Sequence, residues 1–155
     1  MTGIAPIVTL WIAGIFAAPV ETRYLGCTAM VEDGNWAGYE QCLAATYRRH
    51  DPDGSGNRAD VVEFWKHVKV AFPDLRLDPQ LVVADHHDVY AVLLVTGTHE
   101  GTLHCHGDWP ASHKPIRLFV IDRVTFDDTG HATDESFYFD ANVVLAQIGV
   151  LEAAK

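Results

Sequence analysis

Asp140 is the residue whose surroundings point most directly to chemistry. It stands in the stretch YFDANVVLAQIG (138–149), between an aromatic run and a short apolar segment. A carboxylate there can act as a general base if a substrate proton lies within hydrogen-bond reach and burial tunes its pKa. It can equally cap a helix that starts after it, because Asp accepts backbone N–H bonds at helix starts. The two interpretations are compatible, since a capping side chain can also face a cavity.

Two other titratable residues are candidates for acid/base work. Glu135 lies two residues before Phe137, so the two side chains share a face of a regular strand. A solvated strand edge is the alternative position for Glu135. His99, in GTHEG (97–101), can reach a pocket or only bond neighbouring strands. We therefore predict Asp140, His99 and Glu135 as the catalytic candidates.

A metal site is a weaker hypothesis. His104 and His106 alternate in THEGTLHCHGD (98–108), so on a strand they would face one side, as two ligands of one metal do. A properly placed downstream glutamate is missing, and we predict no metal. The chain also has no G-x-S-x-G nucleophile motif and no Walker-type phosphate loop.

Composition excludes further classes of function. A chain of 155 residues fits one domain, and its formal charge of −10 repels phosphate backbones and anionic membrane surfaces. We therefore predict neither nucleic acid nor a membrane as a partner. Cys27, Cys42 and Cys105 are an odd set without a C-x-x-C pair, and we predict free thiols.

Residues 1–18 form an apolar N-terminal extension without charged side chains. The run matches a signal-peptide core in length, but no Lys or Arg precedes it. It is also shorter than the roughly 20 apolar residues of a bilayer span. We predict an ordered extension of a cytoplasmic protein, packed on the domain or on a partner subunit, with a secretory signal as the alternative.

The apolar pattern changes period half-way along the chain. The first half has helix-like spacing and the second half has β-branched and aromatic runs separated by turn residues. We predict helices over 19–32, 37–47 and 58–72, a loop over 48–57, strands within 75–85, 88–106, 114–126 and 131–140, and a closing helix from 141. Helices followed by antiparallel strands predict an α+β fold, in which a sheet curls over helices and leaves a pocket.

Particular residues in this order resemble a known family. The matching segments are EDGNW (32–36), YRRHDP (47–52), AFPDL (71–75), GTHEG (97–101), DDTGH (127–131) and FDANVVLAQIG (139–149). Together they resemble the SnoaL-like polyketide cyclase family, within the nuclear-transport-factor-2-like superfamily of cone-shaped α+β domains. We therefore expect one such domain over 19–155, with residues 1–18 outside it. The resemblance implies a deep, mainly apolar pocket, a hydrophobic small-molecule substrate, no metal and no organic cofactor.

The resemblance also implies a mechanism from which this chain departs. In the cyclases an aspartate removes a carbon-bound proton and a histidine helps to stabilise the enolate. Asp140, seven residues before Gln147, matches a later aspartate of the family. The position of the basic aspartate is occupied here by Phe137, which cannot accept a proton. The aldol step therefore does not transfer unchanged.

The residues predicted to bind substrate come from the same comparison and from the aromatic pattern. His50 and Asp51 match the mouth of the cone, where the family places polar contacts, although a turn also explains Asp51. The aromatic residues predicted to line the pocket or the core are Trp65, Phe119, Phe137 and Tyr138.

The leading hypothesis is an enzyme that uses cofactor-free general acid/base catalysis on a hydrophobic polyketide or terpenoid intermediate. The reaction would be cyclisation, isomerisation or dehydration. One alternative is a non-catalytic ligand-binding or dimerisation domain of the same fold. Another is an epoxide hydrolase-like enzyme, which would need an Asp–Arg–Asp cluster to which Arg117 and Arg123 could contribute. We also expect a homodimer, since the fold often buries its open sheet face against a second copy.

Overall fold

A computed structural model describes residues 19–51 and 54–151 of the chain. The extension predicted for residues 1–18 lies outside the described residues. The helices are α2 (Val20–Glu32), α3 (Trp36–Cys42), α4 (Arg58–Ala71) and α5 (Ala141–Ile148). The strands are β1 (Leu43–Asp51), β2 (Gly54–Asn57), β3 (Arg76–Asp85), β4 (Asp88–Thr98), β5 (Leu103–His104), β6 (Asp108–Trp109), β7 (Pro115–Phe126) and β8 (Ala132–Tyr138). Within the described ranges, no helix is long and apolar enough to cross a membrane.

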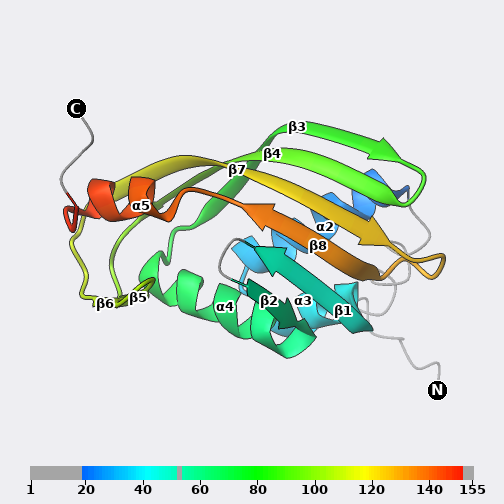
Figure 1. Cartoon of the computed structure of the whole chain (residues 1–155), viewed down its shortest axis with the longest axis horizontal. Helices are drawn as coiled ribbons and strands as arrows, with labels where there is room; N and C mark the ends of the chain where they lie inside the picture. The colour runs from blue at the N-terminus through cyan, green and yellow to red at the C-terminus, as the bar shows by residue number, and fades with distance from the viewer. Residues whose placement is uncertain (1–18, 52–53, 152–155) are drawn as a thin grey trace, which may run out of the picture.

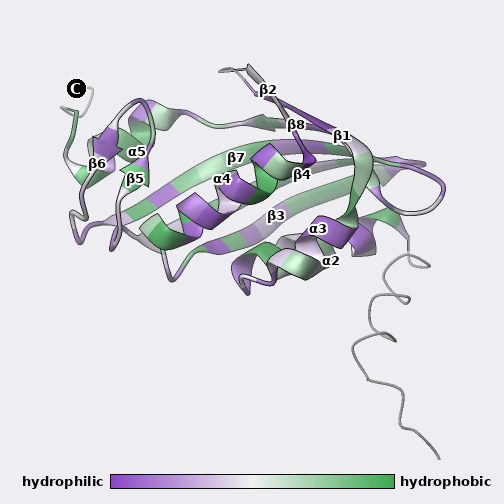
Figure 2. Cartoon of the chain, turned by 90° about the horizontal axis from the view of Figure 1, so that it is seen from below, coloured by the Kyte–Doolittle hydropathy of each residue, from purple (hydrophilic) through white to green (hydrophobic). Residues whose placement is uncertain are grey.

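A curved, unclosed sheet forms one layer and the helices form the other. Its strand order is β2-β1-β8-β7-β4-β3, and β5 pairs with β6 in a separate hairpin. Helices α2, α3 and α4 lie under the concave face, and α5 lies with the β5–β6 hairpin at one end (Figures 1 and 2). The neighbouring strands are antiparallel except β1 and β8, which are parallel. The predicted α+β architecture is confirmed.

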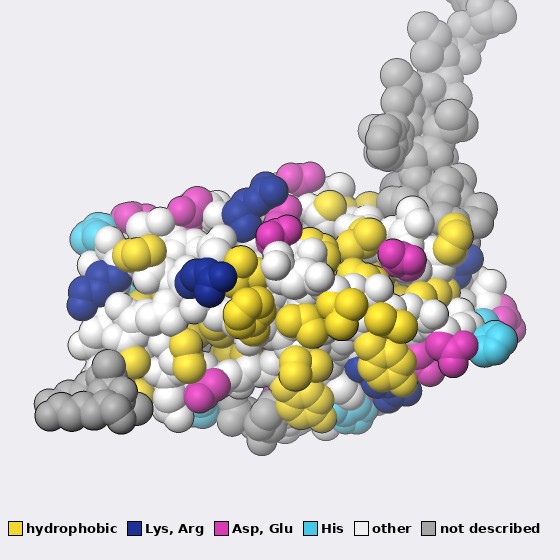
Figure 3. Space-filling model, turned by 90° about the horizontal axis from the view of Figure 1, so that it is seen from above, with side chains coloured by type: hydrophobic (Ala, Val, Ile, Leu, Met, Phe, Trp, Pro, Cys, Tyr) yellow, Lys and Arg dark blue, Asp and Glu magenta, His cyan; other side chains and the backbone are white. Residues whose placement is uncertain are grey.

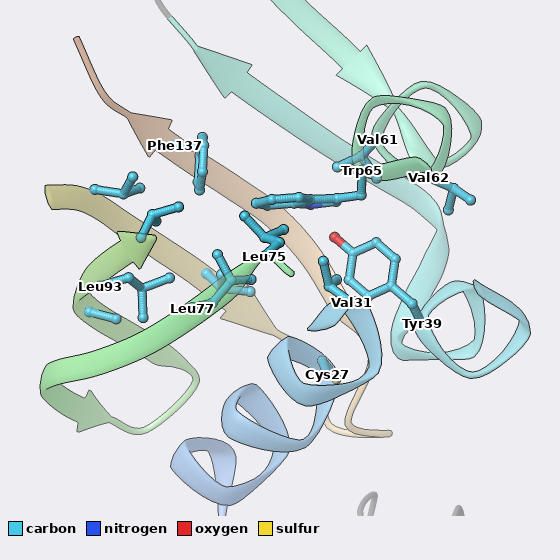
Figure 4. Packing of buried hydrophobic residues seen from close by; sticks show 14 of the residues in the cluster. Cys27, Val31, Tyr39, Val61, Val62, Trp65, Leu75, Leu77, Leu93 and Phe137 are labelled. Carbon is cyan, nitrogen blue, oxygen red and sulfur yellow. The ribbon is translucent and has the colours of Figure 1, made fainter. Parts of the chain in front are cut away.

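Alternation along β7 separates the two faces of the sheet. Leu118, Val120 and Val124 are buried, whereas Phe119 and Ile121 are more than half exposed. Because successive side chains of a strand point to opposite faces, the first set faces the helices and the second faces outward. Figure 4 shows the concave side, where side chains from β3, β4 and β8 meet those from α2, α3 and α4.

Helix α4 lies under the concave face, and its sequence determines where it begins and ends. Asn57 and Asp60 form a capping box, in which each side chain accepts a backbone N–H bond from the other residue. Val61 and Trp65 are buried on the helix face that points to the sheet. The helix ends before Pro73, as its fixed geometry requires.

The predicted second helix was too long. Residues 43–51 form strand β1 and residues 54–57 form β2, where a helix to residue 47 and a loop had been expected. Leu43, Tyr47 and Arg49 are buried at odd positions of β1, which is strand alternation. The pattern was hidden because the inward positions near its end are polar. The pairing of β1 with distant β8 is not visible locally.

The prediction of free thiols was wrong for two of the three cysteines. Cys27 of α2 and Cys42 of α3 form a disulfide, with their Cα atoms 6.0 Å apart. Their side chains meet because α2 and α3 pack against each other, which the sequence spacing does not show. Cys105 is half-buried and lies outside this disulfide. The disulfide also bears on the predicted cytoplasmic location, since such bonds persist mainly in oxidising compartments.

Candidate functional site

A large cavity of about 750 Å³ lies between α4 and the concave face of the sheet. Its walls are mainly apolar, and the aromatic part consists of Phe64, Trp65, Phe72, Phe137 and Phe139. The volume falls within the range of roughly 300–1,000 Å³ typical of small-molecule sites. The cavity can therefore accommodate a hydrophobic molecule of several fused rings.

An ion pair in the wall supplies charge inside this apolar cavity. Arg49 donates hydrogen bonds to Asp51 Oδ2 from Nε at 3.1 Å and from Nη2 at 2.8 Å. Both side chains line the cavity and are largely buried. The guanidinium carbon of Arg49 lies 4.1 Å from the centroid of the Phe64 ring, an additional cation–π contact. Arg49 thus provides a fixed positive charge beside the apolar walls.

Asp140 lies at the lip of the same cavity and is exposed. Its Oδ1 accepts a hydrogen bond of 2.9 Å from the backbone N–H of Asn142, so it is the N-cap of α5. The structure therefore combines the two interpretations of Asp140, a cap that also faces the cavity.

Histidines gather at the rim. His104, Cys105 and His106 of the β5–β6 hairpin line the cavity, together with His67 of α4. The rings of His67 and His104 lie 5.3 Å apart, and His104 Nδ1 is 2.6 Å from Asp108 Oδ1. Among the described residues, no group of three or more His, Cys, Asp or Glu side chains is arranged to hold a metal ion.

His99 lies outside the wall of the large cavity. It is fully buried, its Nδ1 accepts the backbone N–H of Ser112 at 3.2 Å, and its ring packs 5.4 Å from that of Phe72. Burial lowers the pKa of the His99 imidazole, so the neutral form is favoured. These contacts hold the segment before β7 in place, and the His99 ring does not face the large cavity.

A second, much smaller cavity of about 40 Å³ lies deeper, between α2, α3 and the sheet. We call it the inner chamber. Asp122 of β7 and Glu135 of β8 line it, and both are buried. Tyr24 donates a 2.9 Å hydrogen bond to Asp122, and Tyr47 donates one to Glu135. Burial raises the pKa of Asp122 to about 7 and that of Glu135 to about 8.

Three of the residues predicted to bind substrate point away from the cavity. His50 is exposed and bonds Ser55 and Asp134, and about half of each of Phe119 and Tyr138 is exposed on the convex face. Strand alternation explains this, because each immediately precedes or follows an inward residue. Asp51, Trp65 and Phe137 do line the large cavity.

The two arginines considered for epoxide hydrolysis also lie elsewhere. Arg123 pairs with Asp88 at 3.0 Å, and the guanidinium carbon of Arg117 lies 5.4 Å from the ring centroid of Phe119. Neither lines the large cavity or the inner chamber. The arginine of the cavity is Arg49, which the sequence interpretation missed.

The sequence held a signal for the missed groups. In the run from Ile116 to Phe126, every second residue is apolar except Asp122, so the alternation alone places this carboxylate inside. Arg49 follows Tyr47 at the same spacing, and the predicted Asp51 follows Arg49. Polar residues at inward positions of a strand are the pattern that marks a site.

Comparison with known proteins agrees with this architecture. The model of the SnoaL-like polyketide cyclase family matches residues 21–148. The fold is shared with AclR, a proposed hydroxylase from Streptomyces galilaeus, at 20% identity, a TM-score of 0.76 and coverage of 88% of this chain and 84% of AclR. IdmH, a proposed polyketide cyclase from Streptomyces antibioticus, has 19% identity, a TM-score of 0.73 and coverage of 86% and 100%. Among curated proteins, none matches.

The helices under a curved, open sheet and the hollow between them define a nuclear-transport-factor-2-like domain. Because the family model spans most of the chain, the protein belongs to the SnoaL-like polyketide cyclase family.

Proposed function

We propose that the protein is a cofactor-free enzyme that carries out acid/base chemistry on a hydrophobic polyketide or terpenoid intermediate, by cyclisation, isomerisation or dehydration. The observation that carries this proposal is the large cavity, which combines apolar walls with the Arg49–Asp51 pair inside and Asp140 at its lip. Apolar walls with a few convergent polar groups are typical of small-molecule sites.

The polar groups suggest distinct roles. Asp140 is the candidate proton acceptor, because its carboxylate lines the cavity from the start of α5. Arg49 is placed to stabilise negative charge that develops on a substrate oxygen, as an enolate requires. Asp51 holds the guanidinium in place with two hydrogen bonds. His99 and Glu135 do not line the large cavity, so any part they have in the reaction is through other groups.

A product screen tests this proposal directly. The full chain is incubated with extracts from polyketide-producing and terpenoid-producing bacteria, and products are identified by mass spectrometry. Cyclisation or isomerisation gives a new compound of unchanged mass, and dehydration gives one that has lost water. Asp140→Asn should abolish the new product while keeping the helix cap. Ligands retained without any conversion would favour the binding-domain alternative.

Binding of a defined probe tests the role of Arg49. 2-Naphthol is an aromatic enol whose neutral and anionic forms fluoresce differently. We expect Arg49→Met to weaken binding of the naphtholate by about tenfold or more, the loss typical of a charge-assisted hydrogen bond of 1.5–3 kcal/mol. Arg49→Lys keeps the charge and should bind with intermediate affinity. Equal affinity of all three proteins would remove Arg49 from the site.

We also propose that the convex sheet face pairs with a second copy of the chain. Hydrophobic side chains gather on this face (Figure 3), including Tyr90, Phe119, Ile121 and Tyr138, each about half exposed or more. Ile121 and Tyr138 are direct partners across β7 and β8, so the patch is continuous between strands. Sedimentation should show a homodimer that Ile121→Glu converts to a monomer with intact binding of 2-naphthol. A wild-type monomer would refute this part.

A further inference from the structure

Two aromatic side chains separate the large cavity from the inner chamber. Trp65 and Phe137 line both spaces, and their ring centroids lie 5.5 Å apart in an edge-to-face contact. Phe137 is the direct cross-strand partner of Asp122, so their Cβ atoms are about 4.5–5.5 Å apart. Figure 4 shows Trp65 extended across the core towards β8, with Tyr39 beside it. The carboxyl groups therefore lie one side chain behind the large cavity.

The inner chamber contains more hydrogen-bonding capacity than the protein satisfies. Oδ2 of Asp122 accepts the Tyr24 hydroxyl, but Oδ1 is buried and has no partner among the described residues. An unpaired buried polar atom is unfavourable by about 1–3 kcal/mol. Glu135 and the Tyr39 side chain also line the same small space. Donors and acceptors are therefore present in the wall of one small space.

The size of the inner chamber matches water. A cavity needs a volume of about 10–15 Å³ to hold one water molecule, together with two to four polar partners for its hydrogen bonds. The chamber offers about 40 Å³ and meets the requirement for partners. It is too small for an organic ligand. Empty cavities in proteins are apolar, whereas this one is lined by carboxyls and tyrosines, which favours bound water.

The charged and titratable groups around the chamber favour carboxyl groups that keep their protons. Tyr24, Tyr39 and Tyr47 approach from α2, α3 and β1, and burial together with the nearby carboxyls raises the pKa of Tyr24 and Tyr39. Arg49 is the positive group close enough to lower the pKa of Asp122, but the effect of burial is larger. No cation is paired with Glu135 among the described residues, and its pKa is raised by burial alone.

We propose that the inner chamber is a second binding site, occupied by water, and that this water carries protons between the Asp122 and Glu135 carboxyls and the large cavity when the Trp65–Phe137 partition opens. The water site stands on the volume of the chamber and the unpaired Oδ1 of Asp122, and the protonated carboxyls stand on their burial without a paired cation among the described residues. Their use in turnover rests on the proposed function. Asp122 and Glu135 are then positioning residues that supply or take up a proton through water.

Infrared spectroscopy tests the protonated carboxyls without any substrate. Between pH 4 and 10, the full chain should show two buried carboxyl signals that lose their protons with midpoints of about 7 and about 8. Asp122→Asn removes the first and Glu135→Gln the second, and each amide keeps the tyrosine hydrogen bond. Asp78→Asn, at an exposed position of β3, should remove neither. Carboxyl groups that are all ionised by pH 6 would overturn the proposal.

Oxygen-17 relaxation dispersion tests the water. The wild type should contain slowly exchanging water, and Phe137→Leu should shorten its residence time severalfold by thinning the partition. Phe139→Leu is the matched control, because Phe139 lines only the large cavity. Absence of slow water, or equal effects of the two variants, would overturn the proposal.

The two proposals can fail separately. If a product is found, Asp122→Asn should move the pH profile of turnover while Asp78→Asn leaves it unchanged. An unmoved profile would reject the proton exchange and leave the enzyme assignment standing. Slow water and raised midpoints in a protein that converts nothing would instead reject the enzyme and support the chamber as a binding site for water alone.

Discussion

The large cavity and the inner chamber share Trp65 and Phe137 but differ in character. The large cavity has apolar walls, with the Arg49–Asp51 pair in the wall and Asp140 at the lip. The inner chamber instead contains two carboxyl groups that accept hydrogen bonds from tyrosines. The difference arises from single inward positions, since Asp122 replaces one apolar residue in the alternation of β7. The space under one sheet can therefore contain an apolar binding cavity and, beside it, a polar chamber.

The pH dependence of stability should show the largest effect. Asp122 and Glu135 have folded-state pKa values of about 7 and about 8, above their ordinary values of 3.8 and 4.5. Between these limits the folded chain keeps protons that the unfolded chain loses, so the contribution of these two groups to stability is greatest below their ordinary pKa values and falls as pH rises. The loss is on the order of 1.4 kcal/mol per pH unit for each group. Urea unfolding from pH 5 to 8 measures it.

The matched variant for this experiment is Asp122→Asn combined with Glu135→Gln. It should flatten the fall in stability over the same range, because its amides do not titrate. If the free energy of unfolding of the wild type and the double variant varied with pH in the same way, Asp122 and Glu135 would not be the cause of the pH dependence.

The partition should give the next largest effect. Trp65→Ala removes the side chain that separates the two spaces and should lower the free energy of unfolding by about 3–5 kcal/mol, as large-to-small core changes do. Val70→Ala, at an exposed position of the same helix, should lower it by about 1 kcal/mol or less, the range of ordinary surface changes. Similar losses in the two variants would argue against a tightly packed partition.

Asp140 should give the smallest effect on stability. Asp140→Ala removes the N-cap of α5 and should lower the free energy of unfolding by about 1 kcal/mol. Asp140→Asn keeps a capping oxygen and should change it by only a few tenths, since Asn and Asp cap about equally well. Thermal melts of the two variants separate the cap from the charge. Loss of activity in the Asn variant with an unchanged melt would assign the charge to catalysis.

The sequence was sufficient for most of the fold but only in part for the site. The helix from residue 58 and the strands from 76 onward were predictable because their apolar periods and turn residues are strong. Strand β1 was not, since its inward residues Arg49 and Asp51 are polar and its partner β8 is distant in sequence. The site depends on which face each residue takes, and one-residue errors in that choice placed His50, Phe119 and Tyr138 inside.

The Cys27–Cys42 disulfide makes the shape of the inner chamber depend on redox state. Both cysteines line the chamber, and their bond ties α2, which carries Tyr24, to α3, which carries Tyr39. Closing a loop of this length stabilises a protein by about 3 kcal/mol in chain-entropy terms. A reductant would leave the sheet and the large cavity covered by α4. It would loosen α2 and α3, which bring the tyrosine hydroxyls to the carboxyls. Thiol chemistry on one side of the molecule would thereby set how firmly protons are held at its centre.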